Sequence, residues 1–296
     1  MLSDFPDNFH SATGASEESF DTDEPRLLKS VAPDVAIAAA KRLAGRNGSR
    51  VVSESSYAAE MAIARTVQSH LFPHRMPPLE TLDYAGICEE ASAIGGDYYD
   101  FLDIGQGRVG LLLADVSGKG ISAALLMASL QASLRSQRAL APADLPAFFR
   151  TVNRLFCEAV AAGFYATLFF ADYSDAKRSL RYVNCGHYPA FLLHADGWDE
   201  LLGATATVLG FSEKWDCVVG HAEMSPGDIL VMYSDGVTEA RNPSGEFFGE
   251  ERLLGVVRAN ARRPAAEILR AIAASARQFG GEVQEDDLTL VVARAR

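Results

Sequence analysis

Apolar residues recur at two different spacings along this chain, and the spacing changes near residue 80. Before that point the period is helical and predicts a helix from Ser56 to Phe72, with apolar residues four apart at Ala59, Ile63, Val67 and Leu71. Pro73 follows at once and cannot continue a helix. Such a stripe serves two purposes equally well: the helix packs on its own domain, or it pairs with a partner helix or a second copy of itself.

After residue 80 the apolar runs become short and are separated by turn residues, which is typical of strands. Strands are expected at Tyr84–Cys88, Tyr98–Ile104, Val109–Ala114, Phe164–Asp172, Ser179–Val183, Ala190–His194, Val218–Met224, Ile229–Tyr233 and Leu288–Ala293. Helices are expected in two pairs, Ile121–Arg138 with Leu145–Ala161, and Glu250–Ala259 with Ala265–Gln278. Hairpin-like strand succession with paired helices differs from regular βαβ alternation, so the predicted class is α+β with largely antiparallel sheets covered by helix pairs.

The first part of the chain has a different composition. Up to Lys29 it holds seven acids against two bases and few apolar residues, which predicts a disordered tail. An alanine-rich run between Pro33 and Gly45 predicts a short helix over Asp34–Ala44. The expected organisation is therefore an acidic, partly disordered segment over residues 1–55, a connector helix with a proline-rich turn over 56–78, and one main domain over 79–296.

Composition narrows the class of protein. A chain of 296 residues with 48% hydrophobic residues can bury a full core. Its formal net charge of −12 opposes binding to nucleic acid or anionic lipid. No apolar stretch is long enough to span a bilayer and the acidic opening does not resemble a signal peptide, so we expect a cytoplasmic protein. The four cysteines form no Cys-x-x-Cys pair, which indicates neither a zinc site nor a disulfide framework.

Carboxylates beside glycine or a second acid stand next to apolar runs at four places. These are Gly95-Gly96-Asp97, Ala114-Asp115-Val116-Ser117-Gly118, Ser234-Asp235-Gly236 and Asp286-Asp287-Leu288-Thr289. Each alone is typical of a plain turn. Brought together at strand ends, they would form an all-oxygen pocket with enough negative charge for two hard divalent cations, and such a pocket can hydrolyse phosphate esters.

The motifs, taken in order, resemble those of the PPM-type metal-dependent serine/threonine phosphatases, and most closely their bacterial SpoIIE/RsbU group. The matching segments are Gly95–Asp100, Asp115–Gly120, Asn184–Pro189, Ser234–Glu239 and Asp286–Thr289. The resemblance covers about residue 80 to the C-terminus. The segment Val67–Pro73 is also similar to the one that precedes this domain in RsbU-like proteins.

This resemblance implies a four-layer αββα sandwich with a binuclear manganese or magnesium centre. It implies that Asp97 and Asp115 are core ligands with the backbone carbonyl of Val116, and that Asp235 and Asp286 complete the second side. Asp286 is chosen over Asp287 because it matches the first acid of the motif. The same four aspartates are the implied catalytic residues, and the implied substrate is a phosphoserine or phosphothreonine protein, such as an anti-sigma-factor antagonist of the STAS type in a partner-switching pathway.

Several points stay open at this stage. The arginine that grips phosphate in the larger type 2C phosphatases has no match between Leu79 and Glu90, and Lys119 is either its substitute or a solvated loop lysine. His187 is either a general acid or a residue that orders a turn. Asp100 and Glu239 are candidates for hydrogen bonding to the ligands, or ordinary surface acids.

Two rival functions belong to other classes. A catalytically inactive phosphatase-like module would bind a partner without turnover, but all four candidate ligands are present. A diguanylate cyclase shares the Gly-Gly-Asp turn, yet Tyr98 and Tyr99 replace the glutamate and phenylalanine of its motif, and the downstream acids would have no role in that fold.

Overall fold

The computed structural model describes residues 54–138, 144–161, 163–281 and 284–296. Within it Glu54–Arg296 forms one compact unit. The acidic tail and the alanine-rich helix expected over Asp34–Ala44 lie outside the described residues.

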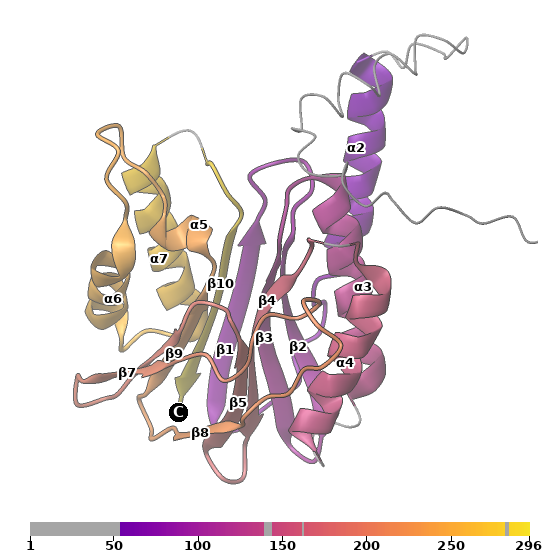
Figure 1. Ribbon diagram of the computed structural model, residues 1–296. Coiled ribbons are helices and arrows are strands. Elements are labelled where there is room, and N and C mark those ends of the chain that lie inside the picture. The colour runs from indigo at the N-terminus through magenta and orange to yellow at the C-terminus, as the bar shows by residue number, and fades with distance from the viewer. Residues whose placement is uncertain (1–53, 139–143, 162, 282–283) are drawn as a thin grey trace, which may run out of the picture. The chain divides into compact units, whose positions relative to one another are not determined.

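Two five-stranded sheets form the centre of this unit (Figure 1). The first has the order β1 (Leu82–Glu89), β10 (Leu288–Ala295), β9 (Ile229–Tyr233), β6 (Ala190–Leu193) and β7 (Asp199–Leu202). The second has the order β2 (Asp97–Gly105), β3 (Arg108–Val116), β4 (Ala166–Ser174), β5 (Ser179–Cys185) and β8 (Gly220–Glu223). Every neighbouring pair in both sheets is antiparallel.

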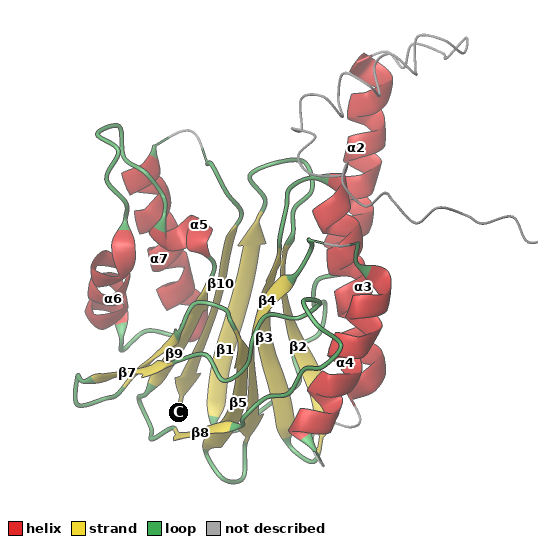
Figure 2. Cartoon of the chain, in the orientation of Figure 1, coloured by secondary structure: helices red, strands yellow, loops and turns green. Residues whose placement is uncertain are grey.

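Helix pairs cover the outer faces of the two sheets (Figure 2). The second sheet is covered by α3 (Ile121–Gln137) and α4 (Leu145–Ala159), and the first by α6 (Gly249–Asn260) and α7 (Ala265–Gly280). A single turn, α5 (Asp235–Thr238), follows β9, and α2 (Glu54–Ser69) precedes the first strand. The predicted α+β class and the αββα layering are confirmed.

Three apolar clusters lie between the four layers. One lies between α3–α4 and the second sheet, one between the two sheets, and one between the first sheet and α6–α7. Strand β3 serves two of them, because Leu111 and Leu113 face the other sheet while Leu112 and Ala114 face the helices. A strand buried on both faces has no polar side, which is why this segment is apolar without alternation.

Most expected elements are present with ends shifted by a few residues. The structure also contains two elements that the sequence does not predict, β7 and α5. Strand β7 begins with Asp199 and Glu200, so its sequence carries little strand signal. Helix α5 is a single turn that begins at Asp235, where the sequence predicts a strand end and a turn. None of the helices in the described ranges is long and apolar enough to cross a membrane.

Candidate functional site

Asp97 and Asp115 lie opposite each other on neighbouring strands. Asp97 is the first residue of β2 and its register partner is Asp115, near the end of β3. Antiparallel pairing brings the start of one strand to the end of the next, so this part of the fold unites two motifs that are 18 positions apart in the chain.

Asp97 is buried and joined to the opposite sheet. Its Oδ2 accepts a hydrogen bond from Thr289 Oγ1, on β10 of the first sheet. Burial raises the pKa of the Asp97 carboxyl well above its usual range, the Asp115 charge raises it further, and the Thr289 hydrogen bond opposes both. The fourth motif therefore contacts the first through Thr289, a residue to which the sequence assigns no role.

Asp115 is at the centre of the acidic group. Burial is the main cause that raises its pKa, to about 7, and the charges of Asp235, Asp286 and Asp287 add to it while Lys119 opposes them. Like charges disfavour ionisation only over short distances. The carboxylates of three motifs are therefore close enough at this edge of the sheets to repel one another.

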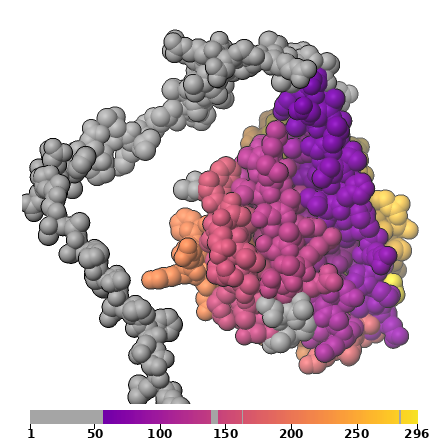
Figure 3. Space-filling view, turned by 90° about the vertical axis from the view of Figure 1, so that its right-hand side faces the viewer, coloured from indigo at the N-terminus to yellow at the C-terminus, as the bar shows by residue number. Residues whose placement is uncertain are grey.

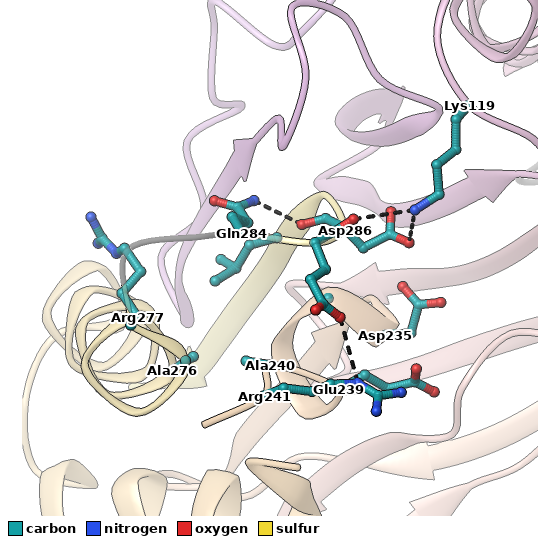
Figure 4. A pocket seen from close by; sticks show the side chains of 14 residues that line it. Lys119, Asp235, Glu239, Ala240, Arg241, Ala276, Arg277, Gln284 and Asp286 are labelled. Carbon is teal, nitrogen blue, oxygen red and sulfur yellow. Dashed lines mark hydrogen bonds and ion pairs between the residues drawn. The ribbon is translucent and has the colours of Figure 1, made fainter. Parts of the chain in front are cut away.

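Asp235 and Asp286 line a cavity of about 150 Å³ together with Lys119 (Figure 4). Asp235 begins α5 directly after β9. Burial and the neighbouring Asp286 raise the pKa of its carboxyl. Asp115 shares a second cavity, of about 30 Å³, with Asp286, and a third, of about 200 Å³, with Asp235. The three aspartates thus lie pairwise around adjoining hollows on one side of the molecule.

The two consecutive acids before β10 have different surroundings. The Oδ2 of Asp286 accepts an ion-pair hydrogen bond of 2.8 Å from Lys119 Nζ, and the side chain is 45% exposed. Asp287 is buried, and its two oxygens accept from the backbone N–H groups of Ala91 and Gly96, at 2.8 and 3.1 Å. Asp287 therefore stabilises the loop between Ala91 and Gly96, while Asp286 faces the cavity.

Glycine is required where these loops approach each other. A Cβ on Gly95 would lie 1.9 Å from Asp287 Oδ2, and one on Gly96 would lie 2.7 Å from the carbonyl oxygen of Val116. The Val116 carbonyl is thus packed against the segment that carries Asp97. As the side chains are placed, no group of three or more His, Cys, Asp or Glu within the described ranges is close enough to hold one metal ion.

His187 lies beside the acidic group but both of its ring nitrogens are engaged. Nε2 is 3.1 Å from the Tyr233 carbonyl oxygen and Nδ1 is 2.8 Å from Thr167 Oγ1. Because a carbonyl only accepts, the neutral ring carries its proton on Nε2 and accepts from Thr167 on Nδ1. Burial lowers the pKa of His187 to about 4. The geometry favours a role in ordering the turn over that of a general acid.

Of the remaining candidates, Glu239 and Lys119 line the cavity and Asp100 does not. Glu239 lines the cavity of Figure 4 and accepts from the Tyr188 hydroxyl at 3.2 Å. Asp100 points to α3 instead, where Arg135 Nε donates to it at 2.7 Å. Lys119 is paired with Asp286 at 2.8 Å, and its side chain is 70% exposed.

Ser234 and Thr289 form a network that the sequence analysis missed. The Ser234 hydroxyl donates to the Asp287 carbonyl, and the Thr289 N–H donates to Ser234 Oγ, both at 3.0 Å. These bonds tie the end of β9 to the start of β10 beneath the acids. Both residues stand inside the motifs that carry the acids, and that position is the one signal of their role.

Comparison with known proteins gives consistent results. The family model described as stage II sporulation protein E (SpoIIE) matches residues 105–296. The phosphoserine phosphatase RsbU of Bacillus subtilis is 31% identical over 240 residues, which is 80% of this chain and 70% of RsbU. Protein IcfG of Synechocystis is 26% identical over 260 residues, but that match spans 78% of this chain and only 41% of IcfG.

Solved structures share the fold. The SiaA-PP2C domain of Pseudomonas aeruginosa superposes with a TM-score of 0.70 at 18% identity, covering 83% of this chain and 99% of the domain. The catalytic domain of the serine/threonine protein phosphatase PstP, solved with two manganese ions, gives a TM-score of 0.56 at 20% identity and covers 73% of this chain and 98% of that domain.

Proposed function

The chain belongs to the SpoIIE family, and from this premise we propose that it is a metal-dependent protein phosphatase that hydrolyses phosphoserine or phosphothreonine on a regulatory protein. The observation that carries the proposal is the convergence of Asp97, Asp115, Asp235 and Asp286, from separate parts of the chain, at one edge of the two sheets. The pKa of Asp115 is raised first by burial and then by the charges of Asp235, Asp286 and Asp287, which shows that these acids lie close together. A site built this way is completed by cations.

Two divalent ions, Mn²⁺ or Mg²⁺, suit the residues present. The donors are all oxygen: the carboxylates of Asp97, Asp115, Asp235 and Asp286, and the Val116 carbonyl. Magnesium is held in many proteins by one or two carboxylates with water filling the other positions, so no cage of three protein ligands is needed. Asp286 is the better ligand of its pair, because it lines the cavity and is 45% exposed, whereas Asp287 is buried and both of its oxygens accept hydrogen bonds from loop N–H groups.

Bound ions of this kind activate a water molecule and neutralise a phosphoryl group under in-line attack, without a covalent intermediate on the protein. The residues around them have their own tasks. Thr289 orients Asp97, and the hydrogen bonds of Asp287 fix the loop that carries it. Lys119, whose partner Asp286 would turn to an ion, supplies a positive charge at the mouth of the cavity for the substrate phosphate.

The substrate we propose is a phosphorylated anti-sigma-factor antagonist of the STAS type, in a partner-switching pathway. Support comes from the identity to RsbU, itself named a phosphoserine phosphatase.

The exposed Ile63 and Val67 of α2 give the chain a further contact surface, for a regulatory partner or a second copy. The division into segments 1–55, 56–78 and 79–296 and a cytoplasmic location stay predictions.

Phosphate release tests the proposed function directly. The full chain is incubated with an aryl phosphate and with a phosphoserine protein, with manganese, with magnesium and with EDTA. We expect release that requires the metal. Asp115→Asn and Asp235→Asn should each lower turnover by more than the roughly 10–100-fold that loss of a residue supporting a ligand costs, because each removes a ligand charge at little steric cost.

Glu251→Gln is the matched control, since it neutralises an exposed acid on α6 away from the site. It should leave turnover unchanged. A metal-loaded chain that releases no phosphate from either compound contradicts the proposal and favours an inactive binding module. An aspartate variant with a normal rate removes that residue from the metal site.

A further inference from the structure

Helix α2 has one buried side chain among those described from Ser56 to Ser69, and that side chain is polar. Gln68 is 4% exposed, whereas its apolar neighbours Ile63 and Val67 are 65% and 61% exposed. A helix that docks on its own domain normally buries an apolar stripe. Within α2 itself, apolar burial therefore contributes little to docking. The helix is held by the buried Gln68, and Leu71 and Phe72, which follow it, pack against the apolar cluster under α3–α4.

Both polar atoms of the Gln68 amide bond to one residue of the site. Its Nε2 donates to the Gly95 carbonyl at 2.7 Å, and its Oε1 accepts from the Gly95 N–H at 3.1 Å. These two hydrogen bonds close a ring between the Gln68 amide and the Gly95 backbone, and a shorter side chain could not form them. Losing it leaves two backbone groups in a buried place without partners, which is costly.

Gly95 belongs to the segment that positions Asp97. The next residue, Gly96, donates its N–H to Asp287 at 3.1 Å, and Asp97 follows directly. Two consecutive glycines leave a backbone with wide conformational freedom and no side chain to anchor it. The segment is therefore held from two sides by hydrogen bonds, from Asp287 before β10 and from Gln68 on α2.

The end of α2 is held independently. The Leu71 carbonyl accepts from Gln131 and Arg135 of α3, both at 3.1 Å. Figure 3 shows the indigo N-terminal part of the described chain running along the face of the α3–α4 layer. These contacts place Gln68 opposite Gly95, so the grip on the site depends on where α2 lies.

We propose that Gln68 is a positioning residue: its two hydrogen bonds to Gly95 hold the segment Gly95–Asp97 in the arrangement that binds the cation, so that cation affinity depends on the docking of α2. The inference rests on the proposed function for the identity of the ligand. Gln68 itself touches neither cation nor substrate.

The test compares Gln68→Met with the wild type in the full chain. Methionine is close in size and favours a helix, but it cannot form either bond. We expect the Kd for Mn²⁺, measured by calorimetry, to rise about tenfold, as expected when two buried hydrogen bonds are lost. The turnover number at saturating Mn²⁺ should stay within about twofold, and the Gly95 amide should exchange its hydrogen faster with solvent.

Gln137→Met is the control, because Gln137 is a partly exposed glutamine on α3 whose amide donates to the neighbouring Ser136 at 3.4 Å. It should change none of these measurements. If Gln68→Met does not fold, Gln68→Glu takes its place, since it keeps the acceptor for the Gly95 N–H and loses the donor to the Gly95 carbonyl. A Kd for Mn²⁺ within twofold of the wild type in the folded variant overturns the inference. A wild type that binds Mn²⁺ without hydrolysing any phosphoester contradicts the proposed function alone, because the affinity measurement needs no turnover.

Discussion

At the scale of single residues, two adjacent acids in one motif have opposite environments. Asp286 is half exposed and paired with Lys119, whereas Asp287 is buried with both oxygens bonded to backbone N–H groups. The same chemical group therefore serves the cavity in one case and the loop in the other. His187 shows a similar contrast, since a residue suited to proton transfer is held neutral by burial.

The two acids should respond differently to substitution. Asp286→Asn should weaken Mn²⁺ binding at least tenfold and leave the free energy of unfolding of the metal-free protein within about 0.5 kcal/mol, because the side chain is exposed. Asp287→Ala should lower that free energy by about 2–4 kcal/mol, because the Ala91 and Gly96 N–H groups lose their partner. Calorimetric titration and urea unfolding measure the two effects. Equal losses of stability in both variants would contradict the assignment.

His187 predicts a pH dependence of stability. Its pKa is about 4 in the folded protein, against an ordinary value of 6.5 for histidine. Because the folded value is the lower one, its contribution is fully present above about pH 6.5 and is lost as the pH falls toward 4, by about 3 kcal/mol in all. His187→Gln removes the imidazole and with it this pH-dependent contribution. Urea unfolding of the metal-free protein at pH 7 and pH 4.5 should show a wild-type stability that falls more steeply than that of the variant; the carboxylates titrate in both and cancel. Parallel curves would remove His187 as the cause.

At the scale of elements, strand ends and loops place the acids, and helices fix the loops. Strands β2 and β3 bring Asp97 opposite Asp115, and the short α5 turns Asp235 toward the cavity. Helix α2 differs from α3, α4, α6 and α7, which bury apolar faces in the two outer clusters. Its Ile63 and Val67 side chains are exposed, which is the observation behind its proposed contact with another molecule.

Self-association through α2 can be measured on the full chain. Sedimentation of the wild type should give the mass of a dimer if a second copy covers α2, and Ile63→Glu with Val67→Glu should then give a monomer, because two charges replace the exposed apolar contacts. Leu201→Glu, at a leucine of β7 that is 54% exposed, is the matched control and should leave the mass unchanged. A monomeric wild type would contradict a second copy and leave a regulatory partner as the occupant of α2.

At the scale of the whole molecule, both sheets contribute to one acidic edge. Thr289 on the first sheet bonds to Asp97 on the second, so the stacking of the sheets is linked to the arrangement of the acids. Without cations the carboxylates at this edge repel one another, which opposes the favourable burial in the cluster between the sheets. Cation binding should therefore stabilise the fold as a whole.

Metal addition and removal test this link. At a Mn²⁺ concentration about 100 times its Kd, the stabilisation should be about 2.7 kcal/mol, since a ligand that binds only the folded state shifts the unfolding equilibrium by mass action. For a domain of this size that corresponds to a rise in Tm of about 5–10 °C, measured by calorimetry. EDTA should reverse it, and Asp115→Asn should reduce it. Bound Mn²⁺ without any change in Tm would contradict the link.

The fold class, the paired helices, most strands and the family can be predicted without coordinates, because periodicity and the order of the motifs are properties of the linear chain. It also identified Asp97, Asp115 and Asp235 as candidates, since each stands beside an apolar run, and the resemblance to the family's motif added Asp286 in preference to Asp287. The residues that hold the site in place become evident only in three dimensions: Thr289, Ser234, Asp287 and Gln68 act across 27 to 192 positions of sequence. Such contacts arise from sheet stacking and helix docking, and no local pattern encodes them.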